Sequence, residues 1–213
     1  MLRFLSVLVV GCAAALALTS PARAGVDVGL SIDDDGVKGF YLAIGEHYRV
    51  PEREIVVVRE RNVPDEELPV VFFLARHASV SPDLIVRLRL GGMSWIDIAL
   101  RYNLSPSIFY IDFDRDPGPP YGKAWGYFRN QDKAKWGQIR LPDADIVNIV
   151  NLKFVSEKYG YSPNEVVKMR ARGDKFVAIH KQVKAAKGKP GKANKSVADT
   201  DDHKSKNPGK KHK

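Results

Sequence analysis

The sequence predicts a mainly α-helical domain of tandem helix-turn-helix-like helix pairs, with a short N-terminal β strand or hairpin and a disordered C-terminal tail. One pattern repeats without gaps in "HYRVPEREIVVVR" (47–59), "HASVSPDLIVRLR" (77–89) and "KYGYSPNEVVKMR" (158–170). A truncated copy, "IALRYNLSPSIFYIDF", occupies 98–113. In each copy the apolar residues recur at helical spacing, which is typical of stacked helix pairs.

Capping residues predict where the helices begin and end. Ser81, Ser105 and Ser162 stand at N-cap positions, and each precedes a proline that suits the first helical turn. Gly91-Gly92 and Gly173 end the second helices of their copies. Together with the apolar spacing, these signals predict helices at 40–48, 51–61, 66–78, 82–90, 94–103, 106–111, 143–159, 163–172 and 175–186.

The first 24 residues have the three parts of a secretory signal peptide. Arg3 precedes the apolar run 4–18, and "PARA" ends in a small-x-small cleavage pattern, so the mature chain is expected to begin near Gly25. We therefore predict export to the periplasm or the extracellular space. The alternative is a lipoprotein, because "VVGC" resembles the motif in which a cysteine, here Cys12, is lipidated.

The rest of the chain divides by composition. Apolar residues alternate in "VDVGLSID", which predicts a strand or hairpin within 25–39. Repeats 1 and 2 fill 40–113, and repeat 3 fills 143–187. Between them, 114–142 is rich in proline, glycine and aromatic residues, which indicates a long loop or a partly structured insertion.

Positive charge is concentrated at the C-terminal end. Residues 181–213 hold eleven lysines and three aspartates, a net charge of +8, whereas 25–180 carry a net charge of −1. With almost no large apolar side chains, 188–213 are expected to be disordered. Either they serve as a solubilising tail or they bind polyanions such as lipopolysaccharide, anionic lipid or extracellular DNA, through Lys187, Lys189, Lys192, Lys195, Lys210, Lys211 and Lys213.

Residues 71–90 resemble the helix-turn-helix superfamily. Ala75 is small where two helices cross, Val80 fills the turn, and Ile85 anchors the second helix. The resemblance implies a tight helix corner, and in DNA-binding relatives the second helix enters the major groove. A slightly acidic body does not suit phosphate binding, so we predict a structural corner and no specific binding of chromosomal DNA. The chain is also similar to uncharacterised secreted bacterial proteins with "GMSW" and "NLKF" type segments, which implies no activity.

An aromatic segment supplies the candidate contact surface. Its aromatic rings alternate with lysine and arginine, so they are able to stack on sugar rings or on a partner's side chains. The alternative is that they pin the long segment to the helices. The candidates are Tyr121, Trp125, Tyr127 and Trp136.

No pattern in the chain indicates catalytic, metal-binding or cofactor-binding residues. His47 and His77 occupy equivalent repeat positions, but no cysteine or further histidine completes a zinc set, so we expect each to face a helix C-terminus. Arg59, Arg89 and Arg170 also recur, which favours carbonyl capping and carboxylate pairing over catalysis.

These observations predict an exported, non-enzymatic helical interaction module of the bacterial cell envelope with a polyanion-binding basic tail. Its partner would be an envelope protein or a polyanion. One alternative is a peptidoglycan- or sugar-binding envelope protein or enzyme that uses the aromatic segment. Another is a nucleic-acid-binding protein.

Overall fold

The computed structural model describes residues 35–187, and this part of the chain is helical without any strand. The α-helices are α1 (Asp35–Tyr48), α2 (Glu52–Glu60), α3 (Leu68–Ala78), α4 (Pro82–Leu90), α5 (Trp95–Arg101), α6 (Gly122–Arg129), α7 (Asp143–Tyr159), α8 (Pro163–Ala171) and α9 (Phe176–Lys187). Short 3-10 helices are η1 (Asp65–Glu67), η2 (Pro106–Phe109) and η3 (Lys133–Gln138). The prediction of a mainly helical fold is confirmed.

Several predictions fall outside the described residues. They are the signal peptide, lipidation at Cys12, the strand or hairpin as far as residue 34, and the tail 188–213 with its lysines. The predicted strand region 25–39 overlaps the described part only at 35–39, and these residues belong to α1. The helix therefore begins five residues before the predicted start at 40.

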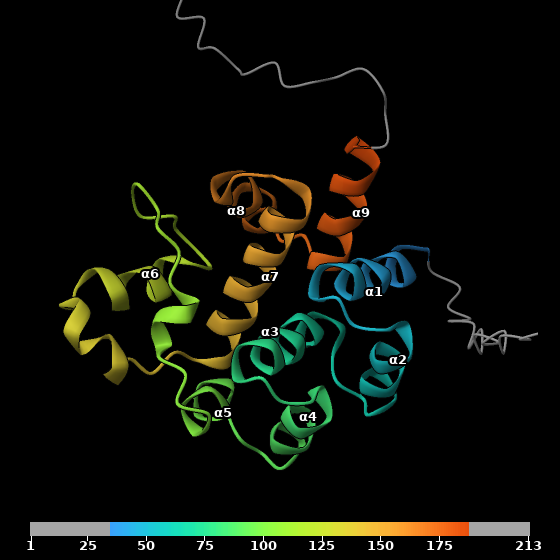
Figure 1. Ribbon diagram of the computed structural model, residues 1–213. Helices are drawn as coiled ribbons and strands as arrows, with labels where there is room; N and C mark the ends of the chain where they lie inside the picture. Colours follow the sequence, from blue (N-terminus) through green and yellow to red (C-terminus); the bar gives the residue numbers. More distant parts are fainter. Residues whose placement is uncertain (1–34, 188–213) are drawn as a thin grey trace, which may run out of the picture.

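Helix α7 is the central element of the fold (Figure 1). It packs against α3 along one side and against α8 and α9 near its C-terminal end, while α1 packs against both α3 and α9. The largest fully buried side chains of the core include six aromatic ones: Phe40, Phe72, Trp95, Phe109, Phe154 and Phe176. Helix α6 lies on the opposite side of α7 from α9 (Figure 1).

The repeat recurs as a common backbone geometry. Arg49, Ser79, Asn103 and Gly160 stand at the same position of their copies, and all four have positive φ angles between 55° and 72°. In the first three copies, the next residue donates its N–H to a carbonyl five residues earlier, at 3.0 Å in each case. This bond pattern closes a helix at a left-handed residue. The predicted corner is thus present four times.

Two of the predicted serine caps form as expected and one does not. The Ser162 hydroxyl accepts from the Glu165 N–H at 3.3 Å, and the Glu165 carboxylate accepts from the Ser162 N–H at 2.7 Å, which completes a capping box. Ser105 accepts from the Ser107 N–H at 3.3 Å. Ser81 occupies the N-cap position of α4, but its hydroxyl makes no capping hydrogen bond there.

The segment 114–142 is more ordered than a loop. It holds α6 and η3, and Ala124 and Phe128 of α6 are buried in the core. The local sequence does not indicate this helix, because Gly122 and Gly126 lower helix propensity and Tyr121 gives no side-chain cap. Tertiary burial of one face stabilises it instead.

Candidate functional site

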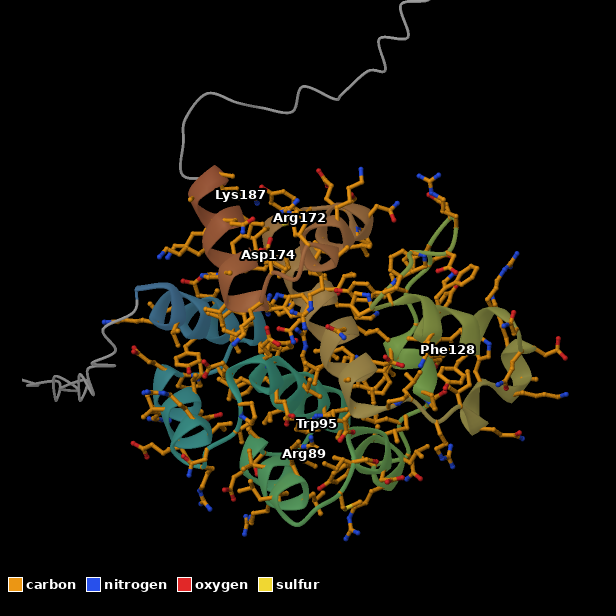
Figure 2. All side chains as sticks on the ribbon, turned by 180° about the vertical axis from the view of Figure 1, so that it is seen from behind. Arg89, Trp95, Phe128, Arg172, Asp174 and Lys187 are labelled. Atoms are coloured by element: carbon orange, nitrogen blue, oxygen red, sulfur yellow. The ribbon has the colours of Figure 1, made fainter. Side chains whose placement is uncertain are left out.

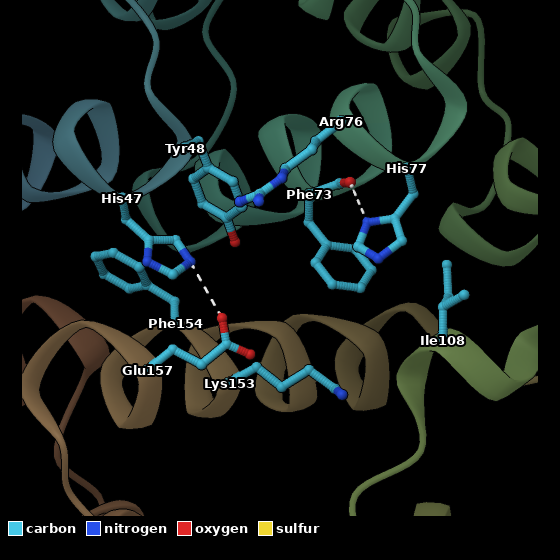
Figure 3. Close-up of a pocket in the computed structure, with 9 residues that line it drawn as sticks. All are labelled: His47, Tyr48, Phe73, Arg76, His77, Ile108, Lys153, Phe154 and Glu157. Carbon is cyan, nitrogen blue, oxygen red and sulfur yellow. Dashed lines mark hydrogen bonds and ion pairs between the residues drawn. The ribbon is translucent and has the colours of Figure 1, made fainter.

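The ends of α1 and α3 and the middle of α7 line a cavity of about 270 Å³ that is open to solvent (Figure 3). His47 and His77 reach it from equivalent repeat positions, because both precede a left-handed corner residue by two. Its walls also include three aromatic rings and one aliphatic side chain, those of Tyr48, Phe73, Phe154 and Ile108. The repeat therefore places two imidazoles at one partly apolar cavity.

The two imidazoles have different partners. His77 Nδ1 lies 2.9 Å from the Phe73 carbonyl oxygen, and because a carbonyl only accepts, this nitrogen carries the proton. His47 Nε2 lies 3.4 Å from a Glu157 carboxylate oxygen. Burial lowers the pKa of His47, although the Glu157 carboxylate partly opposes this effect.

Both histidines stand in the last turn of their helices, as expected, His47 in α1 and His77 in α3. His47 also lies 3.4 Å from the Glu157 carboxylate on α7. Within 35–187, no group of three or more His, Cys, Asp or Glu side chains is arranged to hold a metal ion.

Three charged residues of the cavity were not predicted from the sequence: Arg76, Lys153 and Glu157. Lys153 and Glu157 lie four residues apart on α7 and point in opposite directions along it, Glu157 toward His47 and Lys153 toward the side of His77 and Ile108 (Figure 3). Burial lowers the pKa of the Lys153 ammonium, and Glu157 partly offsets this effect. In the sequence, the only sign that Lys153 and Glu157 act at one place was their spacing of four residues within a predicted helix.

Most of the aromatic candidates pack against other residues of the protein. The Tyr121 side chain is buried, and burial raises its pKa. The Trp136 indole N–H donates to the Phe128 carbonyl at 3.2 Å, and its ring lies 4.6 Å from that of Tyr110. Trp125 is half-buried, whereas Tyr127 is 40% exposed. These contacts anchor the segment, and a partner contact through Trp125 or Tyr127 stays a prediction.

Two of the recurring arginines form equivalent, partly buried junctions. The Arg89 guanidinium donates two hydrogen bonds to the Glu67 carboxylate at 3.1 Å and one to the Met93 carbonyl at 3.2 Å. It also pairs with Asp143, and it lies 4.6 Å from the Trp95 ring centroid (Figure 2). These contacts agree with the predicted capping and carboxylate pairing.

The same junction recurs in the third repeat. The Arg170 guanidinium donates to the Asp174 carbonyl at 2.8 Å, lies 3.7 Å from a Glu66 carboxylate oxygen and covers the Phe176 ring at 4.8 Å. Glu66 also accepts from the Phe176 N–H at 2.7 Å, as Asp143 accepts from the Trp95 N–H in the second repeat. Arg59 differs, because it lies over the Tyr41 ring at 5.7 Å. All these contacts indicate a structural role.

A buried histidine at the contact of α1 and α9 gives a pH-dependent prediction. His180 is 1% exposed, and its Nδ1 lies 2.7 Å from the Tyr159 hydroxyl. Burial first, and the charges of Lys184 and Lys158 second, lower its pKa from 6.5 to about 4. Because the folded pKa is below the unfolded one, this histidine's contribution to stability is complete above pH 6.5 and is lost as the pH falls toward 4.

Between pH 8 and pH 5, we expect His180 to account for a loss of about 2 kcal/mol in the free energy of unfolding. Urea unfolding followed by circular dichroism at several pH values measures this loss. His180→Leu has a flatter pH dependence, while exposed carboxylates such as Glu46 and Glu165 titrate alike in both proteins and cancel. Equal slopes for the two proteins contradict the assignment.

The start of the lysine-rich region belongs to the described part. Lys181, Lys184 and Lys187 are exposed on α9, and Lys187 lies near the end of that helix (Figure 2). The Lys187 ammonium lies 6.0 Å from the Tyr159 ring centroid. The other predicted polyanion-binding lysines lie outside the described residues. Positive charge therefore begins on the exposed face of α9.

Within the described helices, none is both long and apolar enough to cross a bilayer. Comparisons with known proteins give no relative from which a function is transferable. No protein-family model, no curated protein and no solved structure matches this chain.

Proposed function

We propose that the protein is an exported, non-enzymatic interaction module of the bacterial cell envelope, whose helical repeats carry a lysine-rich C-terminal region that binds polyanions. The observation that carries this proposal is the separation of charge along the chain. Residues 25–180 have a net charge of −1, and 181–213 have a net charge of +8. A dense, uncompensated set of lysines attracts phosphate- or sulfate-bearing polymers through counterion release.

The body supports this division of roles. The repeat arginines Arg89 and Arg170 are engaged with carboxylates and carbonyls of the fold, so they are not free to bind a polyanion. The exposed lysines of α9, in contrast, continue directly into the lysine-rich sequence. Lipopolysaccharide, anionic lipid and extracellular DNA share the repeated negative charge that such a region recognises.

A full-length variant tests the proposal. We expect replacement of the eight lysines beyond residue 187 by glutamine to weaken binding to heparin and to double-stranded DNA at least tenfold at low salt. Fluorescence anisotropy with labelled DNA measures the affinity. For the unmodified chain, the logarithm of the binding constant falls linearly with the logarithm of salt concentration, because released counterions drive binding. Helical circular dichroism stays the same, since these lysines lie beyond α9.

The matched control keeps the lysines but permutes the order of residues 188–213. Counterion release depends on the number of charges and not on the order of residues or bases. This variant therefore binds DNA as the original does, and DNAs of unrelated sequence displace one another equally. Undiminished binding by the glutamine variant overturns the proposal. If that variant binds one particular DNA sequence tightly, the helix-turn-helix-like corners of the repeats are the part that recognises DNA.

A further inference from the structure

Residues 121–140 form a basic lobe on the surface of the body. The lobe holds α6 and η3, and its cationic side chains are all exposed: Lys123, Arg129, Lys133, Lys135 and Arg140. Asp132 is the single acidic residue of this stretch, so the lobe has a net charge of +4 and the rest of 25–180 has a net charge of −5. The slightly acidic average of 25–180 therefore includes one strongly basic part.

Carboxylates of the fold do not neutralise the basic lobe. Within the described part of the chain, none of its five cations forms an ion pair. The Arg140 guanidinium donates to the carbonyls of Gly137 and Ile139 at 3.5 and 3.3 Å, which leaves its charge uncompensated. Burial raises the pKa of Asp145, and the charge of Lys123 only partly opposes this effect. The lobe thus differs from Arg89 and Arg170, whose charges are paired inside the fold.

The surface of the lobe favours a nucleic acid over a lipid bilayer as its anionic partner. Among the described large apolar side chains of the lobe, only that of Tyr127 is exposed, at 40%. A helix that binds in a bilayer interface inserts an apolar face, and α6 buries its apolar face, with Ala124 and Phe128, in the core. Tyr127 follows Lys123 by four residues, so both lie on one face of α6, where a base is able to stack beside a phosphate contact.

The basic lobe and the lysine-rich region lie on different sides of the body. Helix α7 lies between α6 and α9 (Figure 1), and the lysine-rich sequence continues from the end of α9. The remainder of 25–180 repels phosphates, because its net charge is −5. The two basic parts are therefore separate surfaces and not one continuous path for a single strand.

We propose that the basic lobe is a second nucleic-acid contact, through which the protein bridges two segments of nucleic acid, one on the lobe and one on the lysine-rich region. The bridging rests on the proposed binding of polyanions by the lysine-rich region. Contact at the lobe is independent of base sequence, because its cations pair with phosphates. Where both segments belong to one long polymer, the second contact forms at a high effective concentration, so the protein compacts that polymer.

A capture assay on the full mature chain tests the bridging. Biotinylated single-stranded DNA is immobilised on beads, the protein is added, and retention of a fluorescent, non-complementary single strand measures bridging. A lobe variant with Arg129→Gln, Lys133→Gln and Lys135→Gln retains at least about fivefold less fluorescent DNA, because it loses three of the five cations of the lobe. The lobe variant itself still binds to the beads through its lysine-rich region. Full bridging by this variant, or no bridging by the unmodified chain, overturns the proposal.

The matched control changes the same residue types elsewhere on the body. Arg53→Gln, Lys168→Gln and Lys175→Gln also remove one arginine and two lysines, all of them exposed and outside the lobe. This control variant bridges as the unmodified chain does, and circular dichroism checks that both variants are folded. Equal losses in the two variants show that bridging follows net charge alone and overturn the role of the lobe.

A lipid arm covers the other class of anionic partner. Sedimentation with phosphatidylglycerol vesicles compares the lobe variant with the unmodified chain, and we expect no difference beyond that of the control variant. If the lobe variant loses vesicle binding while its bridging of DNA is unchanged, the lobe contacts a membrane and the proposal is wrong.

The variant with glutamine in place of the eight lysines beyond residue 187 separates this proposal from the proposed function. It also loses bridging, because only the lobe remains, but it keeps weak binding to one strand, which the three lobe substitutions then remove. If this variant loses DNA affinity while the lobe variant still bridges, bridging by the lobe fails and the proposed function stands. If it keeps its full DNA affinity, the proposed function fails.

Discussion

Ile85→Ala lowers the free energy of unfolding by about 3 kcal/mol, within the range for truncating a buried branched aliphatic side chain. Ile85 is fully buried in α4, where its column of the repeat holds Ile55 in α2 and Val166 in α8. The substitution removes three carbon atoms and leaves a void that close-packed neighbours fill only in part. Urea unfolding followed by circular dichroism measures the change.

Val166→Ala and Val57→Ala remove the same two methyl groups from a buried position and from an exposed one, so together they provide the control for this prediction. Val166→Ala costs about 2 kcal/mol, because Val166 is fully buried like Ile85. Val57 stands two positions after the buried column, where the other copies have Arg87 and Lys168, and it is 46% exposed. Val57→Ala therefore changes stability by about 0.5 kcal/mol or less. Equal effects of the two valine changes contradict the alignment of the repeats.

The sequence predicts the helices well where repetition supports local signals. Gly160 is an obvious residue for a left-handed helix end and Asn103 is the next most favourable type, but Arg49 and Ser79 are not expected there. All four have the same backbone geometry, so the copies with poor local chemistry are recognised only by alignment with the favourable one. Helix α6 has no such copy to support it, and its glycines conceal it.

The cavity is harder to predict because it depends on how α7 is packed. This helix contacts α3, α8 and α9 on different sides and buries even Asn148 and Asn151, so its sequence shows no single apolar face. Without that face, the orientation of Lys153 and Glu157 has no sequence signal. The equivalence of His47 and His77 is visible, but their meeting at one cavity follows only from the crossing of α1 and α3 over α7.

The aromatic segment shows the same limit. Its composition suits either a binding surface or an anchor, and the choice depends on which rings the fold buries. Tyr121 is buried by neighbouring elements, while the Trp136 indole donates to backbone carbonyls of its own segment. No spacing in the sequence separates these residues from the exposed Tyr127.

Arg89→Met is expected to lower the free energy of unfolding by about 3 kcal/mol. The Arg89 side chain is 22% exposed and joins α4 to Glu67 of η1 and Asp143 of α7. Methionine fills part of the volume but leaves two partly buried carboxylates without their common cation. Trp95 also loses the guanidinium above its ring. Urea unfolding at pH 7 measures the loss.

Arg87 on the same helix is the matched control for this prediction. Its guanidinium lies 2.5 Å from an Asp83 oxygen, but the side chain is 62% exposed, and such ion pairs contribute about 0.5 kcal/mol or less. Arg87→Met therefore has little effect, although it removes the same charge. A double-mutant cycle of Arg89→Met with Glu67→Gln gives a coupling of at least about 1 kcal/mol, because the two side chains share two hydrogen bonds. If both arginine variants lose the same stability, burial of the junction is not what makes Arg89 important, and its recurrence at Arg170 needs a different physical cause.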